Sequence, residues 1–247
     1  MTKPPLHPFR LTIFFPCHNE EANVERTTRA ALDAGARFAD DCEVIIVNDG
    51  SRDRTGSLAD ALAATHERVR AIHNPTNLGY GGALQVGFSA ATKDWVFYTD
   101  GDGQFDFDDL AKVIPLLERF DIISAYRVGR CDSAIRKLNA WAWTTLVNAV
   151  FGMRVRDIDC AFKIFPRTLF DHIEMRSTGA LIDAEILAKA NYLGYTIGQV
   201  GVRHYARSEG EQTGANLKVI ARAFVELFRL RQHIKRAKTN PDPRDGS

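Results

Sequence analysis

Residues 95–106 read WVFYTDGDGQFD, and this stretch decides the fold class. Its first five residues are a short apolar run, which is typical of a buried strand in a parallel sheet. The run ends in Asp100 and Asp102, and a glycine follows each carboxylate. Ligands of open α/β sheets bind beyond the carboxyl ends of the strands. A buried strand that ends in carboxylates therefore predicts an α/β sheet and one edge of a site.

The same pattern occurs twice upstream. Residues 11–16 (LTIFFP) and 43–47 (EVIIV) are apolar runs, and polar residues follow each one, CHNEE after the first and NDGS after the second. A helix cap or a turn explains any single polar cluster of this kind. Three clusters at the ends of three predicted strands, on one rim of the sheet, predict a binding site.

Working outward, strand-like and helix-like stretches alternate along the chain. The predicted strands are 11–16, 43–47, 69–73, 95–99, 121–126, 160–165 and 196–204. The predicted helices are 20–36, 53–67, 80–92, 134–152, 183–193 and 216–238. This alternation predicts right-handed βαβ units and a mostly parallel, Rossmann-like sheet with helices on both faces. Trp141 and Trp143 stand at helical spacing, where core packing is the default and contact with a lipid chain is the alternative.

Composition narrows the classes of protein. The chain has 247 residues, 45% of them hydrophobic, and a net charge of +1, which excludes long disorder and disfavours a general nucleic-acid binder. The charge is divided unevenly, because residues 203–247 carry a net +5 and the rest a net −4. Four cysteines without CxxC spacing predict buried free thiols in a reducing cytoplasm. No apolar run reaches the ~18 residues of a membrane span, and none precedes Leu11, so neither a transmembrane segment nor a signal peptide is expected.

The carboxylates of residues 100–106 suggest a divalent cation. Oxygen ligands without a nearby His or Cys favour Mg²⁺ or Mn²⁺ over zinc. A calcium loop would need a closing Glu where Ala111 stands, so that alternative is rejected. A hydrolase with paired acids is the second rival, but acids so close on one loop more naturally share a metal.

The glycine-rich stretch at 77–84 (NLGYGGAL) opens a predicted helix and is a weaker signal. Glycines allow a ligand to approach the backbone, and a helix N-terminus favours an anion. The stretch has neither the GxGxxG fingerprint nor the Lys-Ser/Thr of a P-loop, so neither a dehydrogenase nor a kinase is supported.

As a set, these motifs resemble glycosyltransferase family two, with the GT-A fold, and within it the dolichyl- or polyprenyl-phosphate sugar synthases. The matching pieces cover roughly residues 10–220 and run in the family's order: FPCHNEE, VIIVNDGSRDRT, NLGYGGAL, WVFYTDGDGQFD, DCAFKIF, GALIDAEIL and VRHYARSEGEQTG. The resemblance implies a GT-A catalytic domain at 1–214.

The resemblance also implies roles for individual residues. The residues expected on the nucleotide-sugar donor are Pro16, His18, Glu20, Asp49, Gly79, Arg203, Arg207 and Thr213. Those expected to hold Mg²⁺ or Mn²⁺ are Asp100, Asp102 and Gln104. Asp106 and Arg127 would face the transferred sugar and the phosphates, and Asp183 and Glu185 match an acidic motif on the acceptor side. An arginine for the acceptor phosphate falls near Arg136 and Lys137, in a register that the sequence leaves open.

The resemblance therefore implies the function of an inverting, metal-dependent transferase. Such an enzyme would move a hexose from a UDP- or GDP-sugar to a polyprenyl or dolichyl phosphate. A phosphate acceptor is already ionised at neutral pH and needs no strong general base. Two alternatives stay open. One is a hydroxyl acceptor in polysaccharide or glycolipid synthesis, with Asp183 or Glu185 as the base. The other is a silent subunit that binds a nucleotide sugar without turning it over.

Residues 215–247 are predicted to form a basic amphipathic helix and tail. Phe and Leu interleaved with Arg and Lys are typical of a helix on an anionic membrane surface, although a solvated face on the body has the same pattern. The chain is therefore expected to be cytoplasmic and peripheral on the inner face of a membrane, and its sequence makes no prediction of oligomeric state.

Overall fold

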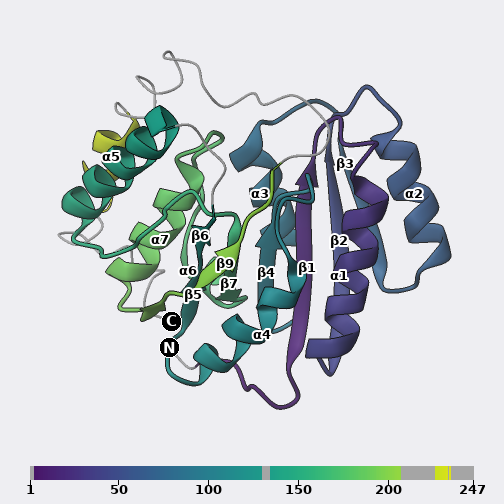
Figure 1. Ribbon diagram of the computed structural model, residues 1–247, viewed down its shortest axis with the longest axis horizontal. Coiled ribbons are helices and arrows are strands. Elements are labelled where there is room, and N and C mark those ends of the chain that lie inside the picture. Colours follow the sequence, from purple (N-terminus) through teal and green to yellow (C-terminus); the bar gives the residue numbers. More distant parts are fainter. Residues whose placement is uncertain (1–2, 130–133, 207–225, 233, 235–247) are drawn as a thin grey trace.

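The computed structural model describes residues 3–129, 134–206, 226–232 and 234 (Figure 1). Its main sheet has seven strands in the order β3-β2-β1-β4-β7-β5-β8. The bounds of these strands, in chain order, are β1 Arg10–Cys17, β2 Asp41–Asp49, β3 Val69–Asn74, β4 Trp95–Thr99, β5 Ile122–Ser124, β7 Phe162–Pro166 and β8 Ile197–Gly198.

The four strands β3, β2, β1 and β4 pair in parallel, which confirms the predicted mostly parallel sheet. The exception is β7, which is antiparallel to both β4 and β5. The central position of β1 and β4 in the sheet explains their near-continuous apolar runs. A strand that is buried on both faces does not alternate between apolar and polar residues. In β4 every residue is buried, and in β1 every residue between Arg10 and Pro16 is buried.

The order of the strands fixes where the helices lie. The chain moves from β1 through α1 (Val24–Phe38) to β2, and through α2 (Thr55–Thr65) to β3, in one direction across the sheet. It then returns through α3 (Tyr80–Ala90) to β4 on the other side of β1. Right-handed crossovers therefore place α1 and α2 on one face and α3 on the opposite face (Figure 1). The reversal makes the ends of β1 and β4 the switch point of the sheet.

Two predicted strands are each broken into two. Residues 121–126 become β5 and the start of β6 (Tyr126–Val128), and residues 196–204 become β8 and β9 (Gly201–Arg203). The chain leaves the main sheet at Ala125, whose N–H bonds to the Phe162 carbonyl, and then β6 and β9 form a separate two-stranded parallel sheet. Pairing partners so far apart in sequence leave no local signal for this break.

The long helices agree with the prediction, whereas several short helices were not predicted. The long helices α5 (Ala134–Phe151) and α7 (Ile182–Tyr192) lie within a residue of their expected bounds. The first helix starts at Val24, because residues 20–23 form a turn in which Asn23 N–H bonds to the Glu20 carbonyl. Four short elements were not predicted: η1 (Phe107–Asp109), α4 (Leu110–Val113), η2 (Ile114–Glu118) and α6 (Leu169–His172).

Of the predicted C-terminal helix, residues 226–232 are described as helical, with Leu227 and Leu230 buried in the core. The rest of that prediction falls almost wholly outside the described residues. Cys17, Cys42 and Cys160 are buried free thiols, as predicted, and Cys131 lies outside the described residues. Within the described part of the chain, no helix is both long and apolar enough to cross a bilayer.

Candidate functional site

The three polar clusters meet at the carboxyl end of the sheet. After β1, the His18 Nδ1 atom donates to the Asp49 carbonyl oxygen at the end of β2 over 2.8 Å. The Thr27 hydroxyl of α1 donates to the Gly101 carbonyl oxygen over 3.2 Å, which fixes the loop after β4. A Cβ on Gly101 would stand 2.6 Å from the Pro16 carbonyl oxygen, so only glycine allows this loop to approach β1 so closely. Pro16, His18 and Asp100 are thereby placed on one rim.

The loop that follows β1 is held by the loop that follows β2. Asn19 has a left-handed φ of 57°, and its backbone N–H donates to the Ser51 hydroxyl over 3.0 Å. The Glu20 N–H donates to the Thr55 hydroxyl over 2.8 Å, at the start of α2. These bonds orient the residues expected to face the nucleoside.

Asp49 holds the glycine-rich turn. Its Oδ1 atom accepts hydrogen bonds from the Asn74 side-chain amide over 2.8 Å and from the Leu78 N–H over 2.9 Å, and its Oδ2 accepts the Gly79 N–H over 3.1 Å. The residue is buried. Both carboxylate oxygens of Asp49 thus have donors within the protein, and Asp49 fixes the shape of the glycine-rich turn. The sequence did not reveal this role. Contact of Asp49 with a nucleotide base stays a prediction.

The glycines of that turn are required by the protein's own backbone. A Cβ on Gly81 would overlap the Ser177 carbonyl oxygen, and the Gly81 N–H donates to the Thr178 carbonyl oxygen over 2.9 Å. Gly79 has a φ of 81°, and its Cβ would stand 2.8 Å from the Thr178 carbonyl oxygen. The start of α3 therefore packs against the loop that leads to α7. These contacts explain the glycines through packing against the loop at Thr178. That the glycines also admit a ligand stays a prediction.

Asp100 and Asp102 form the acidic centre of the rim. Burial, followed by the nearby charges of Asp102 and Asp183, raises the pKa of Asp100 to about 7. The hydroxyl of Tyr80, at the start of α3, acts in the opposite direction and lowers the pKa of Asp100. The Oδ1 atom of Asp102 accepts the Gln104 N–H over 3.0 Å. The side-chain amide of Gln104 donates to the Tyr205 carbonyl oxygen over 2.8 Å.

This donor set fits a divalent cation that also binds substrate. Among the described residues, no group of three or more His, Cys, Asp and Glu side chains is arranged to hold a metal alone. Mg²⁺ is commonly bound through one or two carboxylates together with substrate phosphates, rather than in a cage made by the protein. The two carboxylates Asp100 and Asp102 match that pattern, and the excess negative charge around Asp100 is what a cation would offset.

The raised pKa of Asp100 predicts a stability that depends on pH. A folded-state pKa of about 7, above the ordinary 3.8, means that protonated Asp100 favours the fold and that this contribution is lost as the pH rises from about 4 to 7. Without divalent cations, Asp100→Asn is therefore expected to raise the free energy of unfolding at pH 8 by about 1–4 kcal/mol, and by less at pH 5. Urea unfolding in EDTA at both pH values measures this, and a difference independent of pH would contradict it.

Arg127 of β6 is held by an acidic partner that the sequence analysis did not single out. Its Nε and one terminal nitrogen donate to the two carboxylate oxygens of Asp157 over 2.8 and 2.7 Å. Despite burial, which acts in the opposite direction, this bidentate pair raises the pKa of Arg127. The guanidinium is thus charged and fixed in orientation, as a phosphate or sugar contact requires.

Asp183, at the start of α7, is enclosed with a buried lysine. Lys163 of β7 is fully buried, and its Nζ donates to Asp183 Oδ1 over 2.7 Å, to the Cys160 carbonyl oxygen over 2.6 Å and to the Tyr98 hydroxyl over 3.1 Å. The Tyr98 hydroxyl also donates to Asp183 Oδ1. Asp183 is only 3% exposed. A charged residue inside the apolar run CAFKIF was the available sequence signal for this pair.

Glu185 holds the loop against which α3 packs. Its carboxylate accepts the Arg176 N–H over 3.1 Å, the Ser177 N–H over 2.7 Å and the Lys189 ammonium over 2.5 Å. Burial raises its pKa, but the hydrogen bonds from Lys189 and Ser177 outweigh burial and leave the pKa of Glu185 below its usual value.

The segment that leads to residue 207 is fastened to the loop after β4. Arg203 donates to the buried Asp109 through its backbone N–H, over 2.6 Å, and through its guanidinium, and it also pairs with Asp106 at 2.9 Å. The Tyr205 N–H donates to the Gln104 carbonyl oxygen over 2.8 Å. Asp106 and Arg203 are therefore brought together, whereas Arg207 and Thr213 lie outside the described residues.

Asp159 is a further site carboxylate that the sequence analysis did not select. Burial and the nearby charges of Asp183 and Asp157 raise its pKa to about 6. It accepts a hydrogen bond from Trp143 Nε1 of α5 over 3.2 Å. Asp159 stands two residues after Asp157 and three residues before β7 begins. This repeats the spacing of Asp100 and Asp102, and that repeat was the signal available in the sequence.

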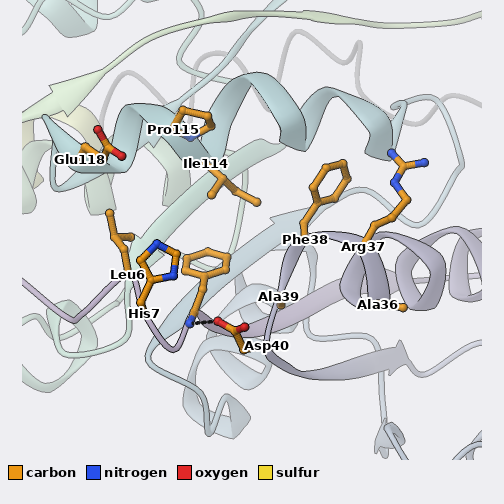
Figure 2. Close-up of a pocket in the computed structure, with 11 residues that line it drawn as sticks. Leu6, His7, Ala36, Arg37, Phe38, Ala39, Asp40, Ile114, Pro115 and Glu118 are labelled. Carbon is orange, nitrogen blue, oxygen red and sulfur yellow. Dashed lines mark hydrogen bonds between the residues drawn. The ribbon is translucent and has the colours of Figure 1, made fainter.

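A cavity of about 510 Å³ lies at the opposite end of the sheet. Figure 2 shows it between the segment that enters β1, the end of α1 and η2, with Leu6, His7, Phe38 and Ile114 on its walls. The dashed line marks the Phe9 N–H donating to Asp40 over 2.6 Å. Because the residues of the rim stand at the carboxyl ends of the strands, this cavity is separate from the candidate site.

Comparison with known proteins gives one family and a consistent set of relatives. The family model described as "Glycosyl transferase family 2" matches residues 12–174. The chain is 30% identical over 202 residues to glycosyltransferase AglD of Haloferax volcanii. This alignment covers 78% of this chain and 32% of that protein. The chain is 27% identical over 216 residues to dodecaprenyl-phosphate galacturonate synthase of Rhizobium johnstonii, which covers 85% of this chain and 63% of that protein. The chain thus spans a third to somewhat under two thirds of these relatives.

A solved structure agrees at the level of the fold. Glucosyl-3-phosphoglycerate synthase of Mycobacterium tuberculosis, in complex with Mn²⁺, uridine diphosphate and glucosyl-3-phosphoglycerate, superposes with a TM-score of 0.67 at 18% identity. The match covers 92% of this chain and 80% of that chain. At this identity, the likeness concerns the architecture alone.

Proposed function

The chain belongs to glycosyl transferase family 2, and from that premise we propose that it transfers a hexose from a UDP- or GDP-sugar to a polyprenyl phosphate, with inversion and with Mg²⁺ or Mn²⁺. The named relatives support the class of acceptor, since one is a dodecaprenyl-phosphate galacturonate synthase and another an undecaprenyl-phosphate 4-deoxy-4-formamido-L-arabinose transferase. In the same proposal, residues 1–214 are the catalytic domain, and the basic segment 215–247 contacts the cytoplasmic face of a membrane.

The observation that carries the choice of acceptor is the state of the acidic motif on α7. A general base must reach the proton that it removes. Asp183 is enclosed by Lys163 and Tyr98, and Glu185 accepts hydrogen bonds from Lys189 and a backbone loop, with a lowered pKa. A hydroxyl acceptor requires such a base, whereas a phosphate acceptor is ionised already. The engagement of both carboxylates therefore favours the phosphate.

On the donor side, Asp100 and Asp102 would hold the cation, which when bound supplies positive charge next to the departing diphosphate. Arg127, fixed by Asp157, presents a second, permanent positive charge. His18 and Glu20, on the loop held by β2 and α2, are proposed to face the nucleoside. Attack by the phosphate oxygen on the anomeric carbon, from the face opposite the leaving group, would convert an α-linked donor into a β-linked lipid phosphate sugar.

The direct test compares two acceptors that differ in one group. The full chain is incubated with labelled nucleotide sugars, Mn²⁺ and either a polyprenyl phosphate or the corresponding polyprenol. We expect a lipid-linked sugar with the phosphate and at least a hundredfold slower transfer to the alcohol, because the alcohol's proton must be removed by a base that the site does not offer.

Two other outcomes would overturn the proposal. Transfer to the alcohol or another hydroxyl, abolished by Asp183→Asn or Glu185→Gln while donor hydrolysis persists, would establish the hydroxyl-acceptor alternative. Binding of a nucleotide sugar by calorimetry, with no turnover for any acceptor, would establish a silent binding subunit.

A further inference from the structure

The start of α1 contacts both glycines that flank Asp102. The Thr27 hydroxyl donates to the Gly101 carbonyl oxygen over 3.2 Å. Gly103 has a left-handed φ of 70°, and a Cβ on it would overlap a terminal nitrogen of Arg26 and stand 3.1 Å from the guanidinium carbon. The Arg26 guanidinium therefore occupies the space that a side chain at position 103 would fill. Asp102 lies in the chain between these two contacts.

A buried asparagine fixes the Arg26 side chain. Asn23, directly before α1, is 2% exposed, and its Oδ1 atom accepts a hydrogen bond from the same terminal nitrogen of Arg26 over 3.0 Å. Its Nδ2 atom donates to the Glu20 carboxylate over 2.8 Å. Asn23, Arg26 and Thr27 stand at i, i+3 and i+4, which places them on one face of the helix. Asn23 therefore connects the loop proposed to face the nucleoside with the turn at 101–103.

The turn at 101–103 is one that needs external contacts to hold a single conformation. Two of its three residues are glycines, and glycine loses more backbone freedom on ordering than any other residue. A cation that bound Asp102 in a loose turn would also have to order the turn, and that cost would weaken its binding. The contacts from α1, on both sides of Asp102, restrict the turn without a cation.

We propose that Arg26 is a positioning residue for the cation site. Held by Asn23, its guanidinium keeps the turn at 101–103 in the conformation that presents the Asp102 carboxylate to the cation. The inference rests on the proposed function only in the assignment of the cation to Asp100 and Asp102.

The test is a titration of the full chain with Mn²⁺ in the absence of donor and acceptor, with free Mn²⁺ measured by electron paramagnetic resonance. Arg26→Met removes the guanidinium and keeps an unbranched side chain. We expect Mn²⁺ to bind about tenfold more weakly, because the cation must then order the glycine turn. The charge of Arg26 alone predicts the opposite sign, since a guanidinium near the site repels a cation. Unchanged or tighter binding of Mn²⁺ would therefore overturn the inference.

The matched control is Arg29→Met, the same substitution one turn further along α1. Both arginines are exposed, and both variants lose one positive charge from the same helix. Arg29→Met should bind Mn²⁺ like the wild type, and urea unfolding verifies that both variants keep the fold. An equal loss of Mn²⁺ affinity in the two variants would contradict a specific role of Arg26.

A second variant keeps the charge of Arg26 and removes its hydrogen-bond partner. Asn23→Ala should also weaken Mn²⁺ binding, by up to about tenfold. The double variant Asn23→Ala/Arg26→Met should bind Mn²⁺ about as weakly as Arg26→Met alone, because Asn23 acts on the turn through Arg26. Additive losses would contradict the inference, because the two residues would then act separately.

Asp102→Ala, in the same titration, separates a failure of this inference from a failure of the proposed function. If Asp102→Ala binds Mn²⁺ as the wild type does, the cation site is wrong and the inference is overturned with it. If Asp102→Ala loses Mn²⁺ and Arg26→Met does not, the cation site stands and only the role of Arg26 is overturned. Weaker binding in both variants supports both assignments.

Discussion

Asp102→Ala should lower kcat for sugar transfer by about a thousandfold, the scale expected when charge stabilisation at a leaving group is removed. Asp102 is one of two carboxylates proposed to hold the cation, and the other is Asp100, whose pKa is raised to about 7 by burial and by the charge of Asp102. A single carboxylate is a weaker site for a divalent cation than two carboxylates. Loss of its neighbour should therefore also weaken Mn²⁺ binding, and steady-state kinetics together with a Mn²⁺ titration measure both effects.

Asp108→Ala is the matched control, because it removes the same charge from η1, the short helix that follows the same loop, outside the rim. Asp108 is exposed and pairs with Arg37 at 2.8 Å, a surface ion pair worth about 0–1 kcal/mol. Its kcat and Mn²⁺ affinity should equal those of the wild type. If Asp102→Ala retained full activity while Mn²⁺ remained necessary, the cation would have other ligands and the assignment of this motif would be wrong.

The part of the fold predictable from sequence is the part encoded locally. Residues 95–106 combine a buried apolar run with carboxylates at its end, so both the strand and its polar rim follow from one stretch. The parallel order of the first four strands then follows from alternation with helices and from right-handed crossovers. The place of β7, antiparallel between β4 and β5, needed the structure, because a short buried strand has no direction in its sequence. The separate β6–β9 sheet needed it as well, because its two strands lie far apart in the chain.

The sequence predicted which polar residues lie on the rim of the site, but not the hydrogen bonds that connect them. Which residues are polar at strand ends is visible in the sequence, whereas which donors occupy Asp49 or Asp183 depends on segments far apart in the chain. Asp49 receives hydrogen bonds from the turn at 78–79, and Asp183 receives them from Lys163 and Tyr98. Gly81 likewise approaches Thr178, which stands almost a hundred residues later in the chain. Such pairings arise only when the sheet is assembled.

A buried chain of polar groups joins the two acidic motifs. Burial, followed by the charges of Asp100 and Asp183, raises the pKa of Tyr80, and Tyr98 hydrogen-bonds Asp183, which Lys163 neutralises. Low dielectric makes each of these bonds stronger than it would be in water, and makes a missing partner correspondingly costly. Lys163 is the only buried cation that the structure records in direct contact with this chain among the described residues, so the stability of the network depends on it.

Lys163→Met should accordingly lower the free energy of unfolding by about 3–5 kcal/mol, because it leaves Asp183 buried without its partner. Methionine has a similar volume, so packing loss contributes little. The double variant Lys163→Met/Asp183→Asn should recover more than half of that loss, since the uncompensated charge is then absent. Urea unfolding of the two variants measures both values.

The control is Lys93→Met, which breaks a pair with the exposed Asp41 at 2.6 Å and should cost only about 0–1 kcal/mol. A single variant as stable as the wild type, or a double variant no better than the single, would mean that Asp183 is not held as a charged partner, and the argument that it is unavailable as a base would lose its support.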